Sequence, residues 1–476
     1  MNFLGIDISL KNTPSLDPQF IPMAVFNREF LKQANTPITL CIERDGGKKA
    51  VYDTYITASN PDADKYYIER LVKYLLWSKG GFKVYIYGCD KMAAHVKDVF
   101  SPTGKYGFDN GFMSKIYEQP FEVITANEKP VENEVSRRVG GKTGGCRIGF
   151  DAGGSDRKVS AVIDGEAVFS EEVVWHPKIT PDPDYHFNGI LDAMRKAASK
   201  MPRVDSIGVS SAGIYINNRT MAASLFLKVS PADFDAKVKD IYIRAAKEIG
   251  KEFGKQIGNK SSNKSSVVVE EIPLTVVNDG DVTALAGAMA FGDNNVLGIA
   301  MGTSEAAGYI DNEGNIKGWL NELAFCPVDA SPNAMRDEWS GDIGCGVKYF
   351  SQDGVIKLAA KAGIKLDESL SPGEKLKHIQ GLLANDDIPG NDTAFAKDIF
   401  RSIGCYLGHT LPYYWDLYRF KNVLLLGRVM SGVGGDLILS EAKRVLSEEY
   451  ADYNFNIHTP DEKMRRVGQS VAAASL

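Results

Sequence analysis

The strongest chemical signal lies in Asn278-Asp279-Gly280-Asp281, which follows an apolar run and precedes a stretch of small residues. The pattern predicts a strand over 272–277 that ends where a helix begins. A carboxylate at such a junction can take a proton from a hydroxyl group that attacks a phosphoryl group. The alternative is that one of the aspartates only caps the helix. Asp281 is the better placed for capping, which would leave Asp279 free for chemistry. From the local sequence alone, the two interpretations are evenly matched.

Two turns of small residues could bind an anion such as phosphate. The turn Ala-Gly-Gly-Ser at 152–155 follows an apolar run that ends in Asp151, and a second β-type run follows it, so a β-hairpin is predicted. Glycine lets backbone N–H groups approach a ligand closely. The same design returns as Gly-Thr-Ser at 302–304. An ordinary hairpin explains either turn alone, but the repeat suggests two similar domains that present their turns to a shared cleft.

The composition is that of an ordinary globular protein. The 476 residues suffice for two or three domains, and the chain is 44% hydrophobic and 24% charged. A net charge of −6 argues against a nucleic-acid partner and against a membrane-surface protein. We find neither an apolar run of about 18 residues nor a secretory signal, so a cytoplasmic protein is expected. The six cysteines form no CxxC pair and are predicted to be reduced thiols.

The elements around these motifs are predicted to alternate between strands and helices. Residues 1–145 indicate a small α/β module, with two strands joined at 45–47, a helix over 63–78, a strand over 83–87, a helix near 92–100 and a strand over 120–126. Later segments predict helices over 188–200 and 232–253 and a strand over 206–210. This last strand runs towards Gly213. Ligands collect at the carboxyl ends of strands in open α/β sheets, so Gly213 joins the candidate site.

Four segments resemble, in order and spacing, the motifs of the ROK family of sugar kinases. They read GFDAGGSDRK (149–158), VVNDGDVTALAGA (276–288), GIAMGTSEAAGYI (298–310) and LLLGRVMSGVGGD (424–436). The likeness covers about residues 147–476, and the final VGQSVAAASL resembles the helix that returns to the first lobe. The resemblance implies an α/β, two-lobed actin-like ATPase (ribonuclease H-like) fold with an additional small N-terminal α/β domain. The expected domains are an accessory domain at 1–145, a first lobe at 146–278 plus 462–476, and a second lobe at 279–461.

The resemblance also implies a role for each motif residue. Asp279 would be the general base for the sugar hydroxyl, with Asn278 beside it holding the sugar. Asp151 would approach Mg²⁺ through water. The other implied contacts are Gly153, Gly154, Ser155, Gly302, Thr303 and Ser304 for the phosphates of ATP, Gly427 for its adenosine, and Gly213 and Glu322 for the sugar.

Two motifs depart from the family pattern. The family's sugar-and-zinc segment reads roughly GExGH, followed by a cysteine cluster; here Glu322 is kept, Phe325 replaces the histidine, and Cys345 alone remains of the cluster. One thiolate cannot build a tetrahedral zinc site, so no zinc is expected. In the second phosphate turn, the family's GTGxGGG becomes Gly302-Thr303-Ser304-Glu305-Ala306-Ala307-Gly308, so residues with side chains replace glycines, and Glu305, at the variable position, adds a carboxylate near the expected triphosphate. That charge is unfavourable there unless the side chain points away or meets the metal.

Two functional classes therefore stay open. The first, favoured because Asp151, Asn278, Asp279 and Glu322 are retained, is an ATP-dependent kinase for a hexose or N-acetylhexosamine. The second is a catalytically weak or inactive ROK-like protein that binds a sugar and regulates. A repressor of that kind would carry a DNA-binding N-terminal domain, and residues 1–145 do not resemble one. The expected partners are a sugar and a nucleotide, and assembly into a homo-oligomer stays open.

Overall fold

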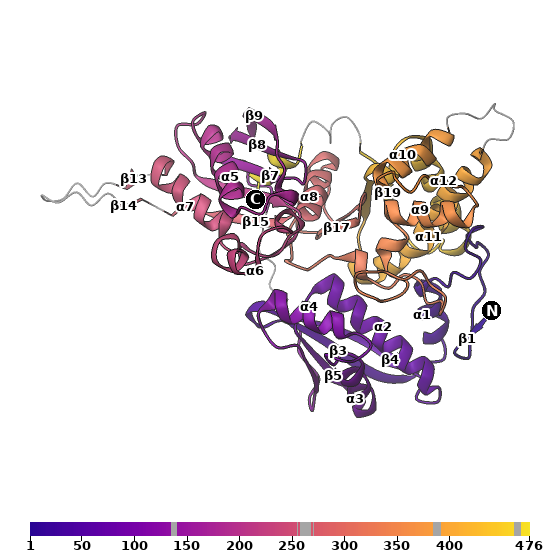
Figure 1. The fold of residues 1–476 in the computed structure, drawn as a ribbon. Coiled ribbons are helices and arrows are strands. Elements are labelled where there is room, and N and C mark those ends of the chain that lie inside the picture. The colour runs from indigo at the N-terminus through magenta and orange to yellow at the C-terminus, as the bar shows by residue number, and fades with distance from the viewer. Residues whose placement is uncertain (135–139, 255, 258–267, 270, 384–391, 461–467) are drawn as a thin grey trace, which may run out of the picture. The chain divides into compact units, whose positions relative to one another are not determined.

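The computed structural model describes residues 1–134, 140–254, 256–257, 268–269, 271–383, 392–460 and 468–476. Figure 1 shows the helices and strands of the chain, which divides into two compact units. Unit 1 consists of Met1–Val135, Ile299–Ala307 and Trp319–Thr459, and unit 2 of Ser136–Gly298, Gly308–Gly318 and Pro460–Leu476. The domain boundaries expected from the sequence stay predictions, and the boundary at 461 and 462 lies outside the described residues.

Unit 2 is built on a mixed five-stranded sheet in the order β15-β10-β7-β8-β9. Strands β7 (Cys146–Ala152), β8 (Asp156–Ile163) and β9 (Glu166–Val174) pair antiparallel, whereas β10 (Ser206–Ser211) and β15 (Leu274–Asn278) run parallel to β7. Asp164 and Gly165, which join β8 to β9, both have positive φ, as a tight hairpin turn requires. Three neighbouring parallel strands therefore end at one edge of the sheet, which is where Asp151, Asn278 and Asp279 lie.

Helices cover this sheet and bury its apolar residues. α5 (Pro183–Ala198) and α7 (Ile241–Phe253) contribute Ile190, Met194 and Ile249 to a core shared with Ile148 and Phe150 of β7. The single helix predicted over 232–253 is divided in the structure into α6 (Pro231–Asp233), a π-helical turn and α7. The remaining elements of unit 2 are β11 (Ile214–Ile216), β12 (Arg219–Ala222), β13 (Gln256–Ile257), β14 (Val268–Val269), α8 (Asp279–Phe291) and α14 (Gln469–Ala474).

Helix α14 packs directly on the strands of this sheet. A Cβ atom at Gly149 would overlap with the carbonyl oxygen of Ser470, and one at Gly208 would overlap with that of Ala473. Both strands therefore require glycine where the helix crosses them. The Nε of Arg147 also donates to the carbonyl of Ala474 at 2.5 Å. The segment that ends the chain is thus an integral part of the sheet's packing.

Unit 1 begins with the expected α/β module. Its sheet has the order β4-β3-β5-β6, and β3 (Thr36–Arg44) forms a hairpin with β4 (Lys48–Ile56). β5 (Lys83–Tyr87) pairs antiparallel with β3 and parallel with β6 (Glu122–Thr125). The other elements of this part are β1 (Asn2–Phe3), β2 (Ile6–Asp7), α1 (Met23–Leu31), α2 (Pro61–Lys79), α3 (Asp90–Val99) and α4 (Gly107–Tyr117).

The rest of unit 1 surrounds the buried helix α11 (Thr393–Tyr418). Its other elements are β18 (Asn422–Leu426), β19 (Asn456–His458), α9 (Gln352–Lys361), α10 (Pro372–Leu382) and α12 (Gly432–Glu449). A four-stranded sheet has the order β17-β16-β18-β19; β16 (Val296–Met301) and β17 (Glu305–Ile310) have residues in both units. Among the helices that the structure describes, none combines the length and apolar character needed to cross a membrane.

Candidate functional site

The expected site residues fall into two groups, one in each unit. In unit 2, the parallel strands place Asp151 next to Ser210, and the Ser210 hydroxyl donates to the Asp151 carboxylate at 2.8 Å. Asp151 is 6% exposed. Burial raises the pKa of Asp151 to about 6, and the nearby charge of Asp279 raises it further against the opposing effect of Ser210. Two acidic side chains therefore interact at one edge of the sheet, an arrangement that favours a cation.

Asp279 is the first residue of α8, directly after β15. Its carboxylate accepts from the Gly280 backbone N–H at 3.1 Å. Burial raises the pKa of Asp279, although that hydrogen bond and the charge of Lys178 lower it. A carboxylate with a raised pKa is a stronger base than an exposed one, which suits it to accept a proton from a hydroxyl group.

The helix cap is Asn278, so the interpretation of Asp281 as the cap was wrong. The Asn278 side chain accepts from Gly280 N at 2.7 Å and donates to the carbonyl of Gly213 at 2.7 Å. Asp281 is buried and accepts instead from the backbone N–H of Tyr309. As expected, Asp279 is not the residue that caps the helix, but the capping residue is Asn278 instead of Asp281. The sugar-binding role of Asn278 stays a proposal.

The first small-residue turn is fixed by one tryptophan. The indole N–H of Trp175 donates to the carbonyl of Gly153 at 2.8 Å, and its backbone N–H donates to the carbonyl of Ser155 at 3.1 Å. A Cβ atom at Gly154 would overlap with the end of the Lys178 side chain, so this ammonium group lies directly over the turn. Sequence reasoning missed Lys178, which comes from a proline-rich loop whose position depends on the tertiary fold.

A second missed residue is Gln469 of α14. Its amide nitrogen lies 3.1 Å from both carboxylate oxygens of Asp151 and can donate to them, while its amide oxygen accepts from the Thr283 hydroxyl at 2.8 Å. The hydroxyl of Thr283 in turn lies 2.9 Å from the carbonyl of Asp279. Gln469 therefore links the acidic end of β7 to the first turn of α8. In the sequence, the one signal for Gln469 was its polar side chain near the start of the largely apolar final segment VGQSVAAASL.

In unit 1, the second turn and Gly427 come together. The Gly302 N–H donates to the carbonyl of Ser304 at 2.9 Å, which closes the turn, and the carbonyl of Gly302 accepts from the N–H of Gln352. Gly427 has a φ of 103°, and a Cβ atom there would overlap with the backbone of Met301. The ends of β16 and β18 therefore lie against each other. Thr303 and Ser304 at the tip of the turn are exposed, as a ligand-binding turn requires.

Glu305 points away from this turn into the interior of unit 1. It is 3% exposed, and the Tyr414 hydroxyl donates to one carboxyl oxygen at 3.4 Å. The other carboxyl oxygen is buried and has no hydrogen-bond partner among the described residues. Burial raises the pKa of Glu305 to about 8, and the charge of Glu322 contributes. At neutral pH the side chain is thus mainly uncharged, which removes the repulsion that a triphosphate near it would meet.

The candidate sugar residue Glu322 is held by the end of α2. Its N–H donates to the carbonyl of Trp77 at 2.9 Å, and the N–H of Asn321 donates to that of Ser78 at 2.9 Å. The last carbonyls of a helix have no partner within the helix, so this segment satisfies them. The accessory module predicted over 1–145 therefore contributes directly to the placement of Glu322.

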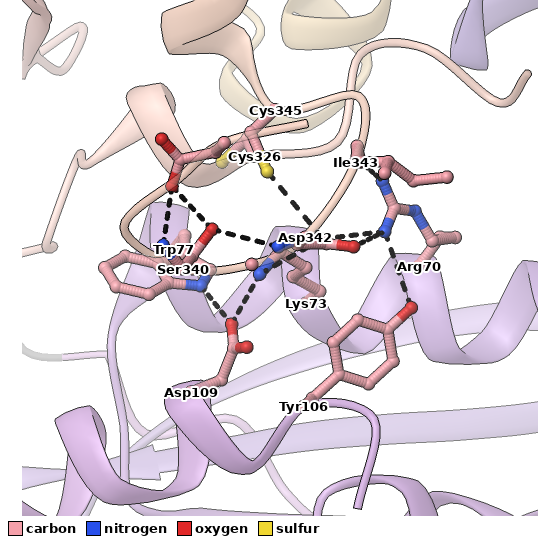
Figure 2. Close-up of polar contacts among 12 residues, drawn as sticks. Arg70, Lys73, Trp77, Tyr106, Asp109, Cys326, Ser340, Asp342, Ile343 and Cys345 are labelled. Atoms are coloured by element: carbon pink, nitrogen blue, oxygen red, sulfur yellow. Dashed lines mark hydrogen bonds and ion pairs between the residues drawn. The ribbon is translucent and has the colours of Figure 1, made fainter. Parts of the chain in front are cut away.

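A buried ion cluster fixes the segment where the family pattern places its cysteines (Figure 2). Lys73 and Arg70 of α2 contact Asp342, at 3.3 and 2.8 Å, and Lys73 also contacts Asp109 at 2.7 Å. Burial would raise the pKa of Asp342, but Arg70 and Lys73 together lower it below its ordinary value. The thiol of Cys345 lies 3.7 Å from the Asp342 carboxylate. The cations of α2 therefore neutralise the acid of this loop.

The same segment offers no evident metal ligands. Among residues 1–134, 140–254 and the later described ranges, no three His, Cys, Asp or Glu side chains are grouped to hold a metal ion. Phe325, at the position of the family's histidine, instead packs on the ring of Trp77, with ring centres 4.4 Å apart. The absence of bound zinc stays a prediction.

Comparisons with known proteins identify the fold. No family model and no curated protein matches the chain. The ROK hexokinase from Thermus thermophilus is 15% identical with a TM-score of 0.50, over 69% of this chain and 96% of that chain. A ROK family glucokinase from Streptomyces griseus, solved with glucose and AMPPNP, is 17% identical with a TM-score of 0.47, over 70% of this chain and 98% of that chain. A ROK family transcriptional regulator, a homologue of the Escherichia coli MLC protein, is 15% identical with a TM-score of 0.47, over 73% of this chain and 81% of that chain.

At this level of identity the likeness concerns the fold. The α/β, actin-like ATPase fold class expected from the sequence is confirmed, and so is the resemblance of the chain to ROK-family structures. The roles of individual residues are not carried over by this comparison.

Proposed function

We propose that the protein is an ATP-dependent sugar kinase that transfers a phosphoryl group to a hydroxyl of a hexose or N-acetylhexosamine. The observation that carries this proposal is Asp279, a partly buried carboxylate with a raised pKa at the junction of β15 and α8. The sugar hydroxyl must lose its proton as its bond to phosphorus forms. Asp279 would accept that proton, while Asn278 and Glu322 would hold the sugar.

The residues of unit 2 fit Mg²⁺ and phosphate by their chemistry. Mg²⁺ is commonly bound through one or two carboxylates, water and substrate phosphates. Asp151, whose pKa is raised by burial and by Asp279, offers such a carboxylate, and Gln469 and Ser210 orient it. When bound, Mg²⁺ would neutralise charge on the phosphates. The ammonium of Lys178 above Gly154 would add a second positive charge beside them.

In unit 1, the exposed tip at Thr303 and Ser304 would donate to the phosphates of ATP, and the turn at Gly427 would lie near its adenosine. The inward direction of Glu305 supports this assignment, because the turn then carries no added carboxylate on its ligand side. A protein that binds the sugar without turnover is the alternative function, and one experiment separates the two.

The test compares Asp279→Asn with the wild type. Asn keeps the shape of Asp but cannot accept the proton, so turnover should fall about 10²- to 10⁴-fold while sugar affinity changes little. Turnover is measured as sugar-dependent ADP release over a panel of hexoses and N-acetylhexosamines, and affinity by calorimetry. Asp235→Asn, at a side chain that is 65% exposed in the same unit, is the matched control and should keep wild-type turnover.

Two results would contradict this proposal, one its catalytic base and the other its activity. Equal turnover in Asp279→Asn and the wild type would show that the base is misassigned. Sugar binding without ADP release for every sugar of the panel would favour the regulatory alternative.

A further inference from the structure

Strand β6 is an edge strand of the sheet β4-β3-β5-β6, and its outer side carries free backbone groups. The N–H groups of Glu122 and Ala126 donate towards β5, to backbone carbonyls at 2.9 Å. Successive residues of a strand turn their backbone groups to opposite sides, so those of Val123 and Thr125 point away from the sheet. Within the described ranges, neither residue has a hydrogen-bond partner on that side. The edge of β6 is therefore open to a further strand.

The opposite edge of this sheet and both edges of the unit 2 sheet are protected. Asn133 covers β4, because its backbone exchanges two hydrogen bonds with Lys49. The Asn218 amide donates to one carbonyl of β15 and accepts from one of its N–H groups, each at 2.9 Å. Strand β9 carries three glutamates, and charged side chains discourage strand pairing. In β6 the one charged residue is Glu122, and its carboxylate lies 3.7 Å from the ammonium of Lys83 in β5.

A hollow of about 470 Å³ lies along the same free edge. Phe100, Phe121 and Val123 contribute apolar surface to it, and the two phenylalanine rings stack with their centres 6.1 Å apart. The charged residues of its lining are Lys97 and Glu122, which have opposite signs. The hollow therefore favours apolar side chains and no net charge. Strand addition combines such a hollow with backbone hydrogen bonds.

The sequence of β6 is complementary to itself in antiparallel pairing. With a twofold axis beside Ile124, the outward backbone groups of Val123 meet those of Thr125 in a second copy. Ile124 then lies opposite its own copy and Glu122 opposite Ala126, so that no like charges face each other. The twofold axis keeps both hollows on the same face of the joined sheet. A second copy of this chain therefore fits both the backbone edge and the hollow.

We propose that β6 is a dimer interface, in which the β6 strands of two copies pair antiparallel about Ile124. The two four-stranded sheets then form one sheet that continues across the copies, and side chains of each copy close the hollow of the other. The residues involved lie outside the candidate site, so this assembly does not depend on the kinase function.

Sedimentation velocity of the full chain over a range of concentrations tests the interface. The wild type should form a dimer whose fraction rises with concentration. Val123→Pro removes an outward N–H from each copy and should raise the dissociation constant of the dimer about tenfold or more. Val131→Pro, at a valine that is 79% exposed and outside the strands, is the matched control and should dimerise as the wild type does.

Charges placed at Ile124 test the register. Ile124→Glu and Ile124→Lys each put two like charges opposite one another across the axis, so each variant alone should dimerise about five- to tenfold more weakly than the wild type. In a mixture of the two variants, opposite charges meet across the axis. The mixed dimer should therefore form more tightly than the dimer of either variant alone.

Three results would overturn the proposal, with the folding of each variant checked by circular dichroism. The first is a wild type that is monomeric at every concentration, which would leave the edge to a strand of another protein. The second is a folded Val123→Pro variant that dimerises as tightly as the wild type. The third is a mixture of the Ile124 variants that dimerises no better than either alone. Kinase activity is measured separately by ADP release, so its failure does not change these outcomes.

Discussion

Burial changes the charge that is expected on the side chain of Glu305. In the sequence it is a carboxylate placed beside a phosphate-binding turn, whereas in the structure it is a buried group with a pKa of about 8. Glu305 is the first residue of β17, a strand that is buried along almost its whole length. The sequence predicts a strand after the turn, but the packing that buries Glu305 comes from residues distant in sequence, such as Tyr414.

The raised pKa of Glu305 predicts how stability depends on pH. The ordinary pKa is 4.5, so the unfolded chain loses this proton above about pH 4.5, whereas the folded protein keeps it until about pH 8. Between these values the folded state binds more protons, and the free energy of unfolding therefore falls as pH rises. Glu305→Gln stays neutral throughout and should become more stable than the wild type as pH increases, on the order of 1 kcal/mol or more at pH 8.

Thermal midpoints of the two proteins between pH 5 and pH 9 provide the measurement. The difference between the midpoints should widen across this range. Glu368→Gln, at a side chain that is 95% exposed, should follow the wild type. Parallel curves for Glu305→Gln and the wild type would show that Glu305 is not held as a neutral acid.

At the scale of elements, α2 is the helix on which the placement of Glu322 and Asp342 depends. Its C-terminal carbonyls hold the segment of Glu322, and its buried cations hold the loop of Asp342. Lys73 is completely buried, and its acid partners raise its pKa against the effect of burial. Within the ion cluster, the positive charges of Arg70 and Lys73 thus compensate the negative charges of Asp109 and Asp342.

Lys73→Met tests that balance. Removing one partner of a buried ion pair leaves a buried charge without compensation, so unfolding free energy should fall by about 3–5 kcal/mol. The readout is the urea midpoint of tryptophan fluorescence, to which four tryptophans of unit 1 and Trp175 of unit 2 contribute. Lys129→Met disrupts an exposed pair with Asp53, whose side chains are 54% and 60% exposed, and should cost less than about 1 kcal/mol. Similar losses in both variants would show that the cluster does not stabilise the fold.

The loop held by this cluster should also contain no zinc. Lys73 places a positive charge beside Asp342, which lies close to the thiol of Cys345, and that charge disfavours a divalent cation there. Elemental analysis of the purified protein should find well below one zinc per chain. One tightly bound zinc per chain would show that the loop has been interpreted wrongly.

Local patterns predicted many elements well, and tertiary contacts account for the rest. The hairpin of β3 and β4 and the strand β5 match the sequence prediction, because alternation and turn residues are local signals. Helix α4 was missed since two glycines give it low intrinsic propensity; it is stabilised by burying Met113 and Ile116. Of the site, Asp151 and Asp279 lie at strand ends as predicted. Lys178 and Gln469 could not be placed, because their partners are distant in sequence.

For the whole molecule, the main finding is that both units are built from separated segments of the chain. Met1–Val135 groups with Trp319–Thr459 in unit 1. The sequence predicts an accessory domain over 1–145 and two lobes, one of them built from 146–278 plus 462–476, and this division stays a prediction. Local patterns do not reveal which distant segments pack together, so the grouping of 1–135 with 319–459 depends on tertiary contacts such as those of Arg70 and Lys73 with Asp342.

Deleting residues 1–134 distinguishes these descriptions. Without α2, Asp342 loses both cations and the segment of Glu322 loses its support, so residues 319–459 should exchange their amide hydrogens rapidly. The sheet of β7 and β10 in unit 2 should stay protected, because its core contains no residue of the deleted segment. Hydrogen exchange resolved by mass spectrometry is the measurement. Unchanged protection of residues 319–459 would identify 1–134 as a dispensable accessory domain.

The ion pair of Arg70 and Asp342 also has a consequence for folding while the chain is being synthesised. These residues are 272 positions apart, and a ribosome adds about 5–20 residues each second. Helix α2 is therefore synthesised tens of seconds before the acid that Arg70 requires and before Phe325, which packs on Trp77. During this interval a cation and an aromatic face destined for the interior stay uncovered. Whatever shelters α2 in the nascent chain, whether a chaperone or a temporary contact within residues 1–134, determines how much of the protein reaches its folded state.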